Sequence, residues 1–185
     1  MHQYVRNLTV DVGKGNPGAV GLRFMTNNSG AMYDVTVRIS DPERVGAIGL
    51  DLSCHQFGPG YIKNVTVIGF DRAVTTGSSF SMVLEHLTIE GQRKMGFHNS
   101  GANVTIRDLK SRNKVPAIVN DQRSITLTDA TLNTEASSRK QKGFRSSCLR
   151  ISPVRRLLSS GSSAWAKSGA VGKITMFSRT ERTRC

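Results

Sequence analysis

A four-residue pattern that occurs six times constrains this chain more than any other feature. The pattern is a polar residue, an aliphatic residue, Thr and a second aliphatic residue. Successive Thr residues are separated by 27, 30, 22, 17 and 21 residues, a mean of about 23 that is typical of solenoid repeats. The six copies are Asn7-Leu8-Thr9-Val10, Asp34-Val35-Thr36-Val37, Asn64-Val65-Thr66-Val67, His86-Leu87-Thr88-Ile89, Asn103-Val104-Thr105-Ile106 and Ser124-Ile125-Thr126-Leu127.

The pattern alternates in the way that a half-buried β-strand requires, because strand side chains point to the two faces in turn. The aliphatic residues on both sides of each Thr predict a buried face, and the Thr residues predict an outer row of six. A second strand-like segment, in which Gly or Ala precedes an apolar residue, follows each of the first five copies. These segments are 21–24, 49–52, 73–75, 96–98 and 117–119. Two strands per repeat, with turn residues between them, predict an all-β solenoid of about six rungs.

Two other folds fit the sequence less well. A β-sandwich requires antiparallel hairpins, and two-residue Asn-Gly or Asp-Gly turns do not occur in the sequence. A βαβ fold requires helices between the strands. The connecting segments, such as residues 26–30, are too rich in Asn and Gly for helices.

The net charge of +13 is distributed unevenly. Residues 1–136 carry 14 basic and 12 acidic side chains, whereas residues 137–185 carry 12 basic side chains and Glu181 alone as an acid. We therefore divide the chain into a β-helix region, 1–136, and a basic tail rich in Ser and Arg, 137–185, which we expect to be irregular or disordered. The repeat region itself does not predict nucleic-acid binding, since its charge is nearly balanced.

Three interpretations of the tail are open. A basic arm would bind nucleic acid or another anionic surface, with a steep salt dependence. A cap would cover the last coil, as solenoids require. A translation out of frame after about residue 136 would explain why the Thr-centred pattern stops abruptly.

The sequence resembles a known superfamily in three stretches: residues 15–37 (GNPGAVGLRFMTNNSGAMYDVTV), 58–74 (GPGYIKNVTVIGFDRAV) and 83–101 (VLEHLTIEGQRKMGFHNSG). They are similar to the pectate-lyase-like right-handed parallel β-helices, in particular to the subgroup related to rhamnogalacturonases and glycoside hydrolases. The resemblance covers about residues 4–133. It implies a right-handed parallel β-helix, a polysaccharide substrate and a secreted parent protein, although no signal peptide is visible in residues 1–10. The catalytic motifs of polygalacturonases and pectate lyases are absent from the sequence.

Candidate site residues follow from the chemistry of polysaccharide cleavage, which typically uses two carboxyl groups roughly 5–10 Å apart. The outward positions two residues after each Thr are Asp11, Arg38, Ile68, Glu90, Arg107 and Thr128. Of these we select Glu90, and we add Asp108 and Asp71 from nearby loops as further candidate catalytic acids. Arg93, Lys94 and His98 are the candidate substrate-binding residues. The competing interpretation is a solvated surface with ordinary charge pairing.

Three further motifs have structural explanations. Residues 13–18 match the Gly-x-Gly-x-x-Gly pattern, but Pro17 and the apolar residues that follow predict a turn into a strand. Cys54 and His55 are adjacent in sequence, so a strand would point them apart, and we predict that Cys54 is buried. The glycosylation motifs at Asn7, Asn27, Asn64 and Asn103 are better explained by Asn residues at coil corners.

The sequence also bears on cofactors and on the membrane. The three Cys and four His residues show no spacing typical of a metal site, and we expect no cofactor and no metal. No apolar stretch is long enough to span a membrane. The sequence therefore predicts a fragment of a polysaccharide-processing β-helix of hydrolase or lyase type, which need not be active alone, and the alternative is a non-enzymatic β-solenoid for carbohydrate binding or adhesion.

Overall fold

The computed structural model describes residues 2–27, 29–54, 58–77, 81–134, 147–149 and 173–177, and its regular elements are all β-strands. Up to residue 134, long strands alternate along the chain with short ones. The long strands are β1 (His2–Asp11), β3 (Ser29–Arg38), β5 (Gly60–Ile68), β7 (Ser81–Glu90), β9 (Asn103–Asn113) and β11 (Ser124–Thr134). The short strands are β2 (Val20–Arg23), β4 (Ile48–Leu52), β6 (Arg72–Thr76), β8 (Met95–Asn99) and β10 (Ile118–Asn120).

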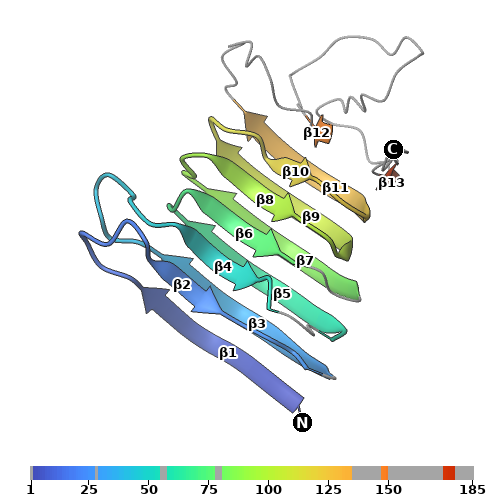
Figure 1. The fold of residues 1–185 in the computed structure, drawn as a ribbon, viewed down its shortest axis with the longest axis horizontal. Coiled ribbons are helices and arrows are strands. Elements are labelled where there is room, and N and C mark those ends of the chain that lie inside the picture. The colour runs from blue at the N-terminus through green and yellow to red at the C-terminus, as the bar shows by residue number, and fades with distance from the viewer. Residues whose placement is uncertain are drawn as a thin grey trace, which may run out of the picture.

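The strands form two sheets, and the chain passes from one sheet to the other at every step (Figure 1). The long strands pair in parallel in the order β1-β3-β5-β7-β9-β11. The short strands pair in parallel in the order β2-β4-β6-β8-β10. This solenoid-like arrangement confirms the all-β prediction and the prediction of two strands per repeat.

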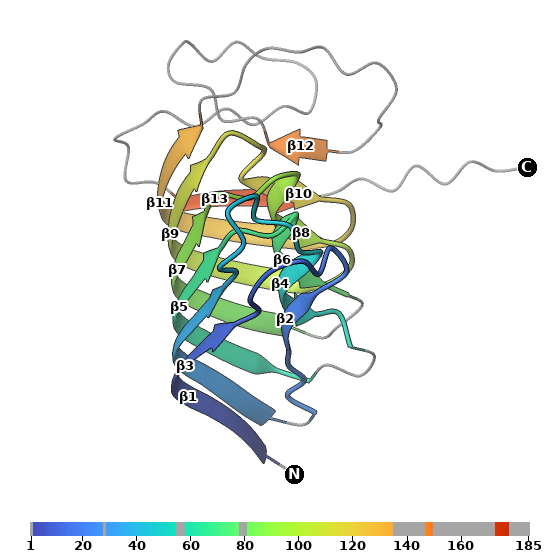
Figure 2. The same cartoon turned by 90° about the vertical axis from the view of Figure 1, so that its left-hand side faces the viewer.

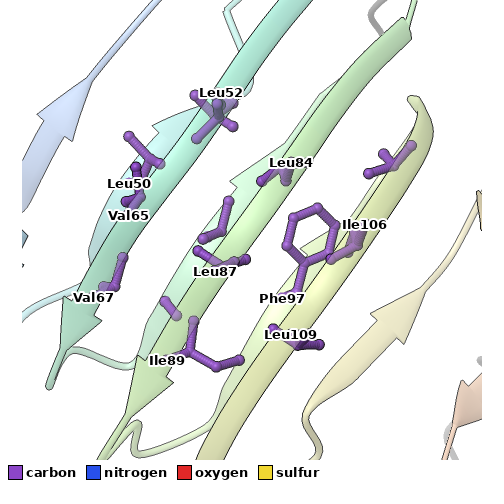
Figure 3. Packing of buried hydrophobic residues seen from close by; sticks show 14 of the residues in the cluster. Leu50, Leu52, Val65, Val67, Leu84, Leu87, Ile89, Phe97, Ile106 and Leu109 are labelled. Carbon is purple, nitrogen blue, oxygen red and sulfur yellow. The ribbon is translucent and has the colours of Figure 1, made fainter. Parts of the chain in front are cut away.

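Aliphatic side chains from both sheets fill the space between them (Figure 3). Ten of the twelve aliphatic residues that flank the repeated Thr residues are buried, as the alternation predicts. The exceptions are Leu8, which is 39% exposed, and Val10, which is partly buried. Both belong to β1, which pairs with β3 alone among the described strands and forms one edge of their sheet.

Each long strand of the parallel stack contains one residue in the left-handed backbone conformation, with φ between 52° and 55°. These residues lie at one level of the sheet. In each pair of neighbouring long strands, the two left-handed residues face each other but are left out of the strand pairing, which resumes on both sides of them. Figure 2 shows the long strands bending at this level, which we call the corner. Asn, Asp and His tolerate this conformation better than most residues. The corner residues are Asn7, Asp34, Asn64, His86, Asp108 and Asp129.

The corner confirms part of the sequence interpretation and corrects part of it. Asn7, Asn27 and Asn64 have positive φ, as expected of Asn residues at turns and corners, but Asn103 does not. The predicted outer row of six Thr residues is likewise wrong after β7. Thr88 pairs with Lys110, whereas Thr105 pairs with Val83. The copies at 103–106 and 124–127 therefore lie before the corner, although the first four copies begin at it.

The small residue near the start of β4, Gly49, is required by the close approach of the two sheets. A Cβ atom added at Gly49 would overlap the side chain of Val67 and would lie 2.9 Å from the carbonyl oxygen of Ala73. It would also lie 3.1 Å from the ring of Phe70. This confirms that a tight position at the start of β4 needs a residue without a side chain.

Two short strands lie in the segment 137–185 that we expected to be irregular. β12 (Ser147–Leu149) pairs antiparallel with β10, and β13 (Lys173–Phe177) pairs antiparallel with β11. The remainder of that segment lies outside the described residues. The three interpretations of the tail, translation out of frame among them, therefore stay predictions. The described residues contain no helix that is long and apolar enough to cross a membrane.

Candidate functional site

Three of the six predicted site residues lie together in the turns that follow β5 and β7. Asp71 Oδ2 is 2.6 Å from Lys94 Nζ, and its Oδ1 is 3.6 Å from Arg93 Nη1. The pKa of Asp41, in a neighbouring turn, is lowered first by the Gly15 N–H and to a smaller extent by the charge of Arg93. The two cations expected to bind substrate are therefore engaged with carboxylates of the protein itself.

Glu90 and Asp108 have different partners and lie at different levels of the sheet. Glu90 pairs in register with Arg112, whose Nη1 lies 3.8 Å from its carboxylate. Asp108 is a corner residue, and its Oδ2 lies 2.7 Å from His86 Nδ1. The His86 contact lowers the pKa of Asp108. Four residues of strand, about 13 Å, separate the level of Glu90 from that of Asp108. The catalytic assignment of Glu90, Asp108 and Asp71 stays a prediction.

The sixth predicted residue, His98, belongs to the other sheet. Its Nε2 atom lies 2.7 Å from Asp121 Oδ2, and the side chain is 14% exposed. It is the neighbour of Thr75 in the ladder of short strands. The structure therefore brings Asp71, Arg93 and Lys94 together and places Glu90, Asp108 and His98 at three separate positions.

The same ladder of short strands holds a buried carboxylate that the sequence reasoning did not single out. Asp51 is 1% exposed, and it accepts hydrogen bonds from the Ser53 N–H at 2.9 Å and from Arg23 Nε–H at 2.8 Å. Burial alone would raise the pKa of Asp51, but the hydrogen bonds from Ser53 and Arg23 outweigh it and hold the pKa below 3.8. Asp51 therefore stays ionised at neutral pH and links β2 to β4.

We expect Asp51→Asn to lower the free energy of unfolding at pH 7 by about 1.5–3 kcal/mol, the range for a hydrogen bond to a charged group. The pKa of Asp51 is lower in the folded state than in the unfolded state. Its contribution to the free energy of unfolding is therefore complete above the unfolded pKa. That contribution is lost as pH falls through the folded pKa, which lies below 3.8. Urea unfolding at pH 7 and pH 3 measures both effects. A variant whose loss at pH 3 equals its loss at pH 7 would contradict this role for Asp51.

The outward side of the long strands before the corner carries a group of residues that we call the tyrosine face. All three tyrosines of the sequence, Tyr4, Tyr33 and Tyr61, lie on it. The face consists of two rows, each with one residue from every long strand of the parallel stack. The first row is Tyr4, Ala31, Tyr61, Val83, Thr105 and Thr126, and the second is Arg6, Tyr33, Lys63, Glu85, Arg107 and Thr128.

Contacts across the strands hold the centre of the tyrosine face in place. The rings of Tyr33 and Tyr61 meet edge to face with centroids 5.7 Å apart. The Tyr61 hydroxyl donates a hydrogen bond of 2.6 Å to Glu85 Oε2. Glu85 also lies 4.0 Å from Lys63 Nζ and 3.8 Å from Arg107 Nη1. One carboxylate therefore organises an aromatic hydroxyl and two cations at the surface.

Tyr61 and Glu85 keep their charge states through the neutral pH range. The hydrogen bond to Glu85 raises the pKa of Tyr61 to about 12. The same bond, together with the charges of Lys63 and Arg107, lowers the pKa of Glu85. With Arg6, the two rows carry three basic side chains and one acidic one, so the face has an excess of positive charge.

The other motifs take structural roles among the described residues. Gly13 and Gly15 have positive φ in the connection between β1 and β2, and a strand follows them, as predicted. Cys54 is partly exposed, so the prediction that it is buried is wrong. His55 lies outside the described residues. In the part of the chain that the structure describes, no group of three or more His, Cys, Asp or Glu side chains could hold a metal ion.

Comparison of the chain with protein-family models, with curated proteins and with solved structures gave no match. The two sheets, the corner residues and the tyrosine face are therefore established from this chain alone.

Proposed function

We propose that the chain is a right-handed parallel β-helix of about six rungs, similar to the pectate-lyase-like superfamily. The support is the strict alternation between two parallel sheets and the row of left-handed residues at the corner. Right-handed connections are also the general rule between parallel strands of one sheet. A secreted parent protein belongs to the same proposal.

We further propose that the chain binds an acidic polysaccharide along the tyrosine face. The observation that carries this proposal is the gathering of all three tyrosines beside Arg6, Lys63 and Arg107 on one outward face. Tyrosine rings offer flat apolar surface to the C–H groups of a sugar and keep a polar hydroxyl in water. The basic side chains attract carboxylate groups, and their excess over Glu85 favours an anionic polymer.

The shape of the face suits an extended polymer. The rows run across neighbouring strands that are about 4.8 Å apart, so six strands give a track of about 24 Å. At the end of the track, Thr105, Thr126 and Thr128 supply hydroxyl groups. Each of these hydroxyls can donate and accept hydrogen bonds to sugar hydroxyls.

The geometry favours binding over cleavage. Glycoside hydrolysis commonly uses two carboxyl groups at a defined separation. In the two rows of the tyrosine face, Glu85 is the single carboxylate, and it is committed to Tyr61, Lys63 and Arg107. We therefore favour the non-enzymatic alternative, carbohydrate binding, over polysaccharide processing.

Affinity electrophoresis tests the proposal. We expect gels that contain polygalacturonate, polyglucuronate or alginate to retard the protein, and neutral dextran to leave its mobility unchanged. The same polymers incubated with the protein should show no new reducing ends and no unsaturated products. Lack of retardation by all three acidic polymers would contradict binding, and product formation would favour the enzymatic alternative.

A further inference from the structure

The two rows of the tyrosine face share a spacing of two strands. In the first row, Tyr4 and Tyr61 lie on β1 and β5, with Ala31 of β3 between them. Neighbouring strands are about 4.8 Å apart, so the two tyrosines are about 9.6 Å apart at the backbone. Ala31 is only 4% exposed, whereas Tyr4 is 66% exposed, so the rings stand above the small residue between them.

The cations of the second row have the same spacing. Arg6, Lys63 and Arg107 lie on β1, β5 and β9, again on every second strand. Tyr33 and Glu85 occupy the strands between them. An aromatic ring and a cation thus recur together at Tyr4 with Arg6 and at Tyr61 with Lys63, about 9.6 Å apart.

A polymer that follows these rows must present an apolar sugar face and a carboxylate at the same interval. In an extended β-1,4-linked polyuronate, each sugar is turned over relative to the one before. Every second sugar therefore shows the same face, and every second carboxylate projects from the same side. An extended disaccharide has a length of the same order as two strand spacings. In α-1,4-linked polygalacturonate the favoured form in solution is a threefold helix, so every third sugar, and not every second one, shows the same face.

We infer that the tyrosine face recognises β-1,4-linked polyuronates and selects them over α-1,4-linked polygalacturonate. This inference rests on the proposed function, because it names the ligand class of the same surface. One disaccharide of the polymer spans two strands, with a sugar ring on each tyrosine and a carboxylate at each cation of the second row. Glu85 lies between Lys63 and Arg107 and competes with the polymer for both of them.

Three hexasaccharides separate linkage from charge. Isothermal titration calorimetry would compare a β-1,4-linked glucuronate hexamer, an α-1,4-linked galacturonate hexamer and neutral cellohexaose on the full chain. The two uronate hexamers have equal charge, and they differ in linkage and in the configuration at C4 of the sugar. We expect the β-linked hexamer to bind at least about fivefold more tightly than the α-linked one, with cellohexaose weaker than both.

Two charge variants test the arrangement of the second row. Lys63→Ala should weaken binding of the β-linked uronate about two- to fivefold, the size of an exposed charge interaction, and should leave cellohexaose binding unchanged. Glu85→Gln should strengthen uronate binding by a similar factor, because it releases Lys63 and Arg107. Lys110→Ala is the matched control, since Lys110 lies beyond the corner in the ladder of Thr88.

The outcomes distinguish this inference from the proposed function. A β-to-α preference below about fivefold, or a preference for the α-linked hexamer, would overturn the inference on linkage and leave polysaccharide binding intact. Failure of both uronate hexamers and of the acidic polymers to bind would overturn both. Weakening by Lys110→Ala equal to that by Lys63→Ala would overturn the role of the second row.

Discussion

Replacement of both Tyr4 and Tyr61 by Ala is expected to weaken binding of acidic polysaccharide about a hundredfold. Stacking of an aromatic ring on a nucleic-acid base is worth about 1–3 kcal/mol in alanine substitutions. A value of about 1.4 kcal/mol for each tyrosine against a sugar ring lies within that range and corresponds to about tenfold per tyrosine. The two residues are about 9.6 Å apart at the backbone, far enough for their effects to add. Affinity electrophoresis on the two single variants and the double variant measures this directly.

The matched control for this prediction keeps the rings and removes the hydroxyls. Tyr4→Phe with Tyr61→Phe should retain most of the affinity, although it loses the hydrogen bond from Tyr61 to Glu85. Thermal unfolding followed by circular dichroism shows whether the double alanine variant is folded. Affinity equal to that of the unmodified protein in a folded double alanine variant would contradict the role of the rings. A phenylalanine variant as weak as the alanine one would assign binding to the hydroxyls.

Phe97→Ala is expected to lower the free energy of unfolding by about 3–5 kcal/mol, the usual range for removing a large buried aromatic side chain. Phe97 is fully buried on β8 between Val74 and Ile118 of the neighbouring short strands. Its ring projects into the interior shared with the long strands, where Ile106 and Leu109 also lie (Figure 3). A loss of this size is a large fraction of the roughly 5–15 kcal/mol typical of a folded domain.

Urea unfolding measures this loss, and two variants calibrate it. Phe97→Leu leaves a smaller cavity and should cost less than Phe97→Ala. Val83→Ala changes a partly exposed position of the tyrosine face and should stay within about 0.5 kcal/mol of the unmodified protein. If Phe97→Ala cost no more than Val83→Ala, the two sheets would not share the interior described here.

The sequence predicted the parallel β architecture because the repeat is encoded in local alternation. The flanking residues of the first four Thr copies face the interior from β3 onward. The predicted register was wrong for the last two copies. The motif at 103–106 resembles the earlier copies in sequence, but it lies five residues before the segment of β9 that pairs with the copy in β7. That segment is Asp108 to Ser111, which has Lys110 where the other copies have Thr.

The tyrosine face was missed for a related physical reason. Strict alternation counted back from Thr9 and Thr66 would place Tyr4 and Tyr61 on the inward side. The left-handed residues Asn7 and Asn64 add one residue at the corner and invert the alternation before it. A single sequence does not reveal that inversion. The available signal was the Asn, Asp or His residue at the start of each of the first four copies.

The candidate acids were selected by type and by spacing along the chain, which does not show their partners. Asp71 lies beside Arg93 and Lys94, because the turns after β5 and β7 are neighbours. The sequence does not show that Glu90 faces Arg112 or that His86 meets Asp108, since both contacts depend on the register between β7 and β9.

Nuclear magnetic resonance of the protein with isotope-labelled tyrosine rings tests the central claim most directly. The chain contains three tyrosines, and all of them lie on the tyrosine face, so every labelled signal reports on that surface. We predict that titration with the β-1,4-linked glucuronate or the α-1,4-linked galacturonate hexamer shifts the signals of all three rings. Binding of either hexamer with all three ring signals unchanged, or failure of both to bind, would contradict the claim that this face holds the polymer.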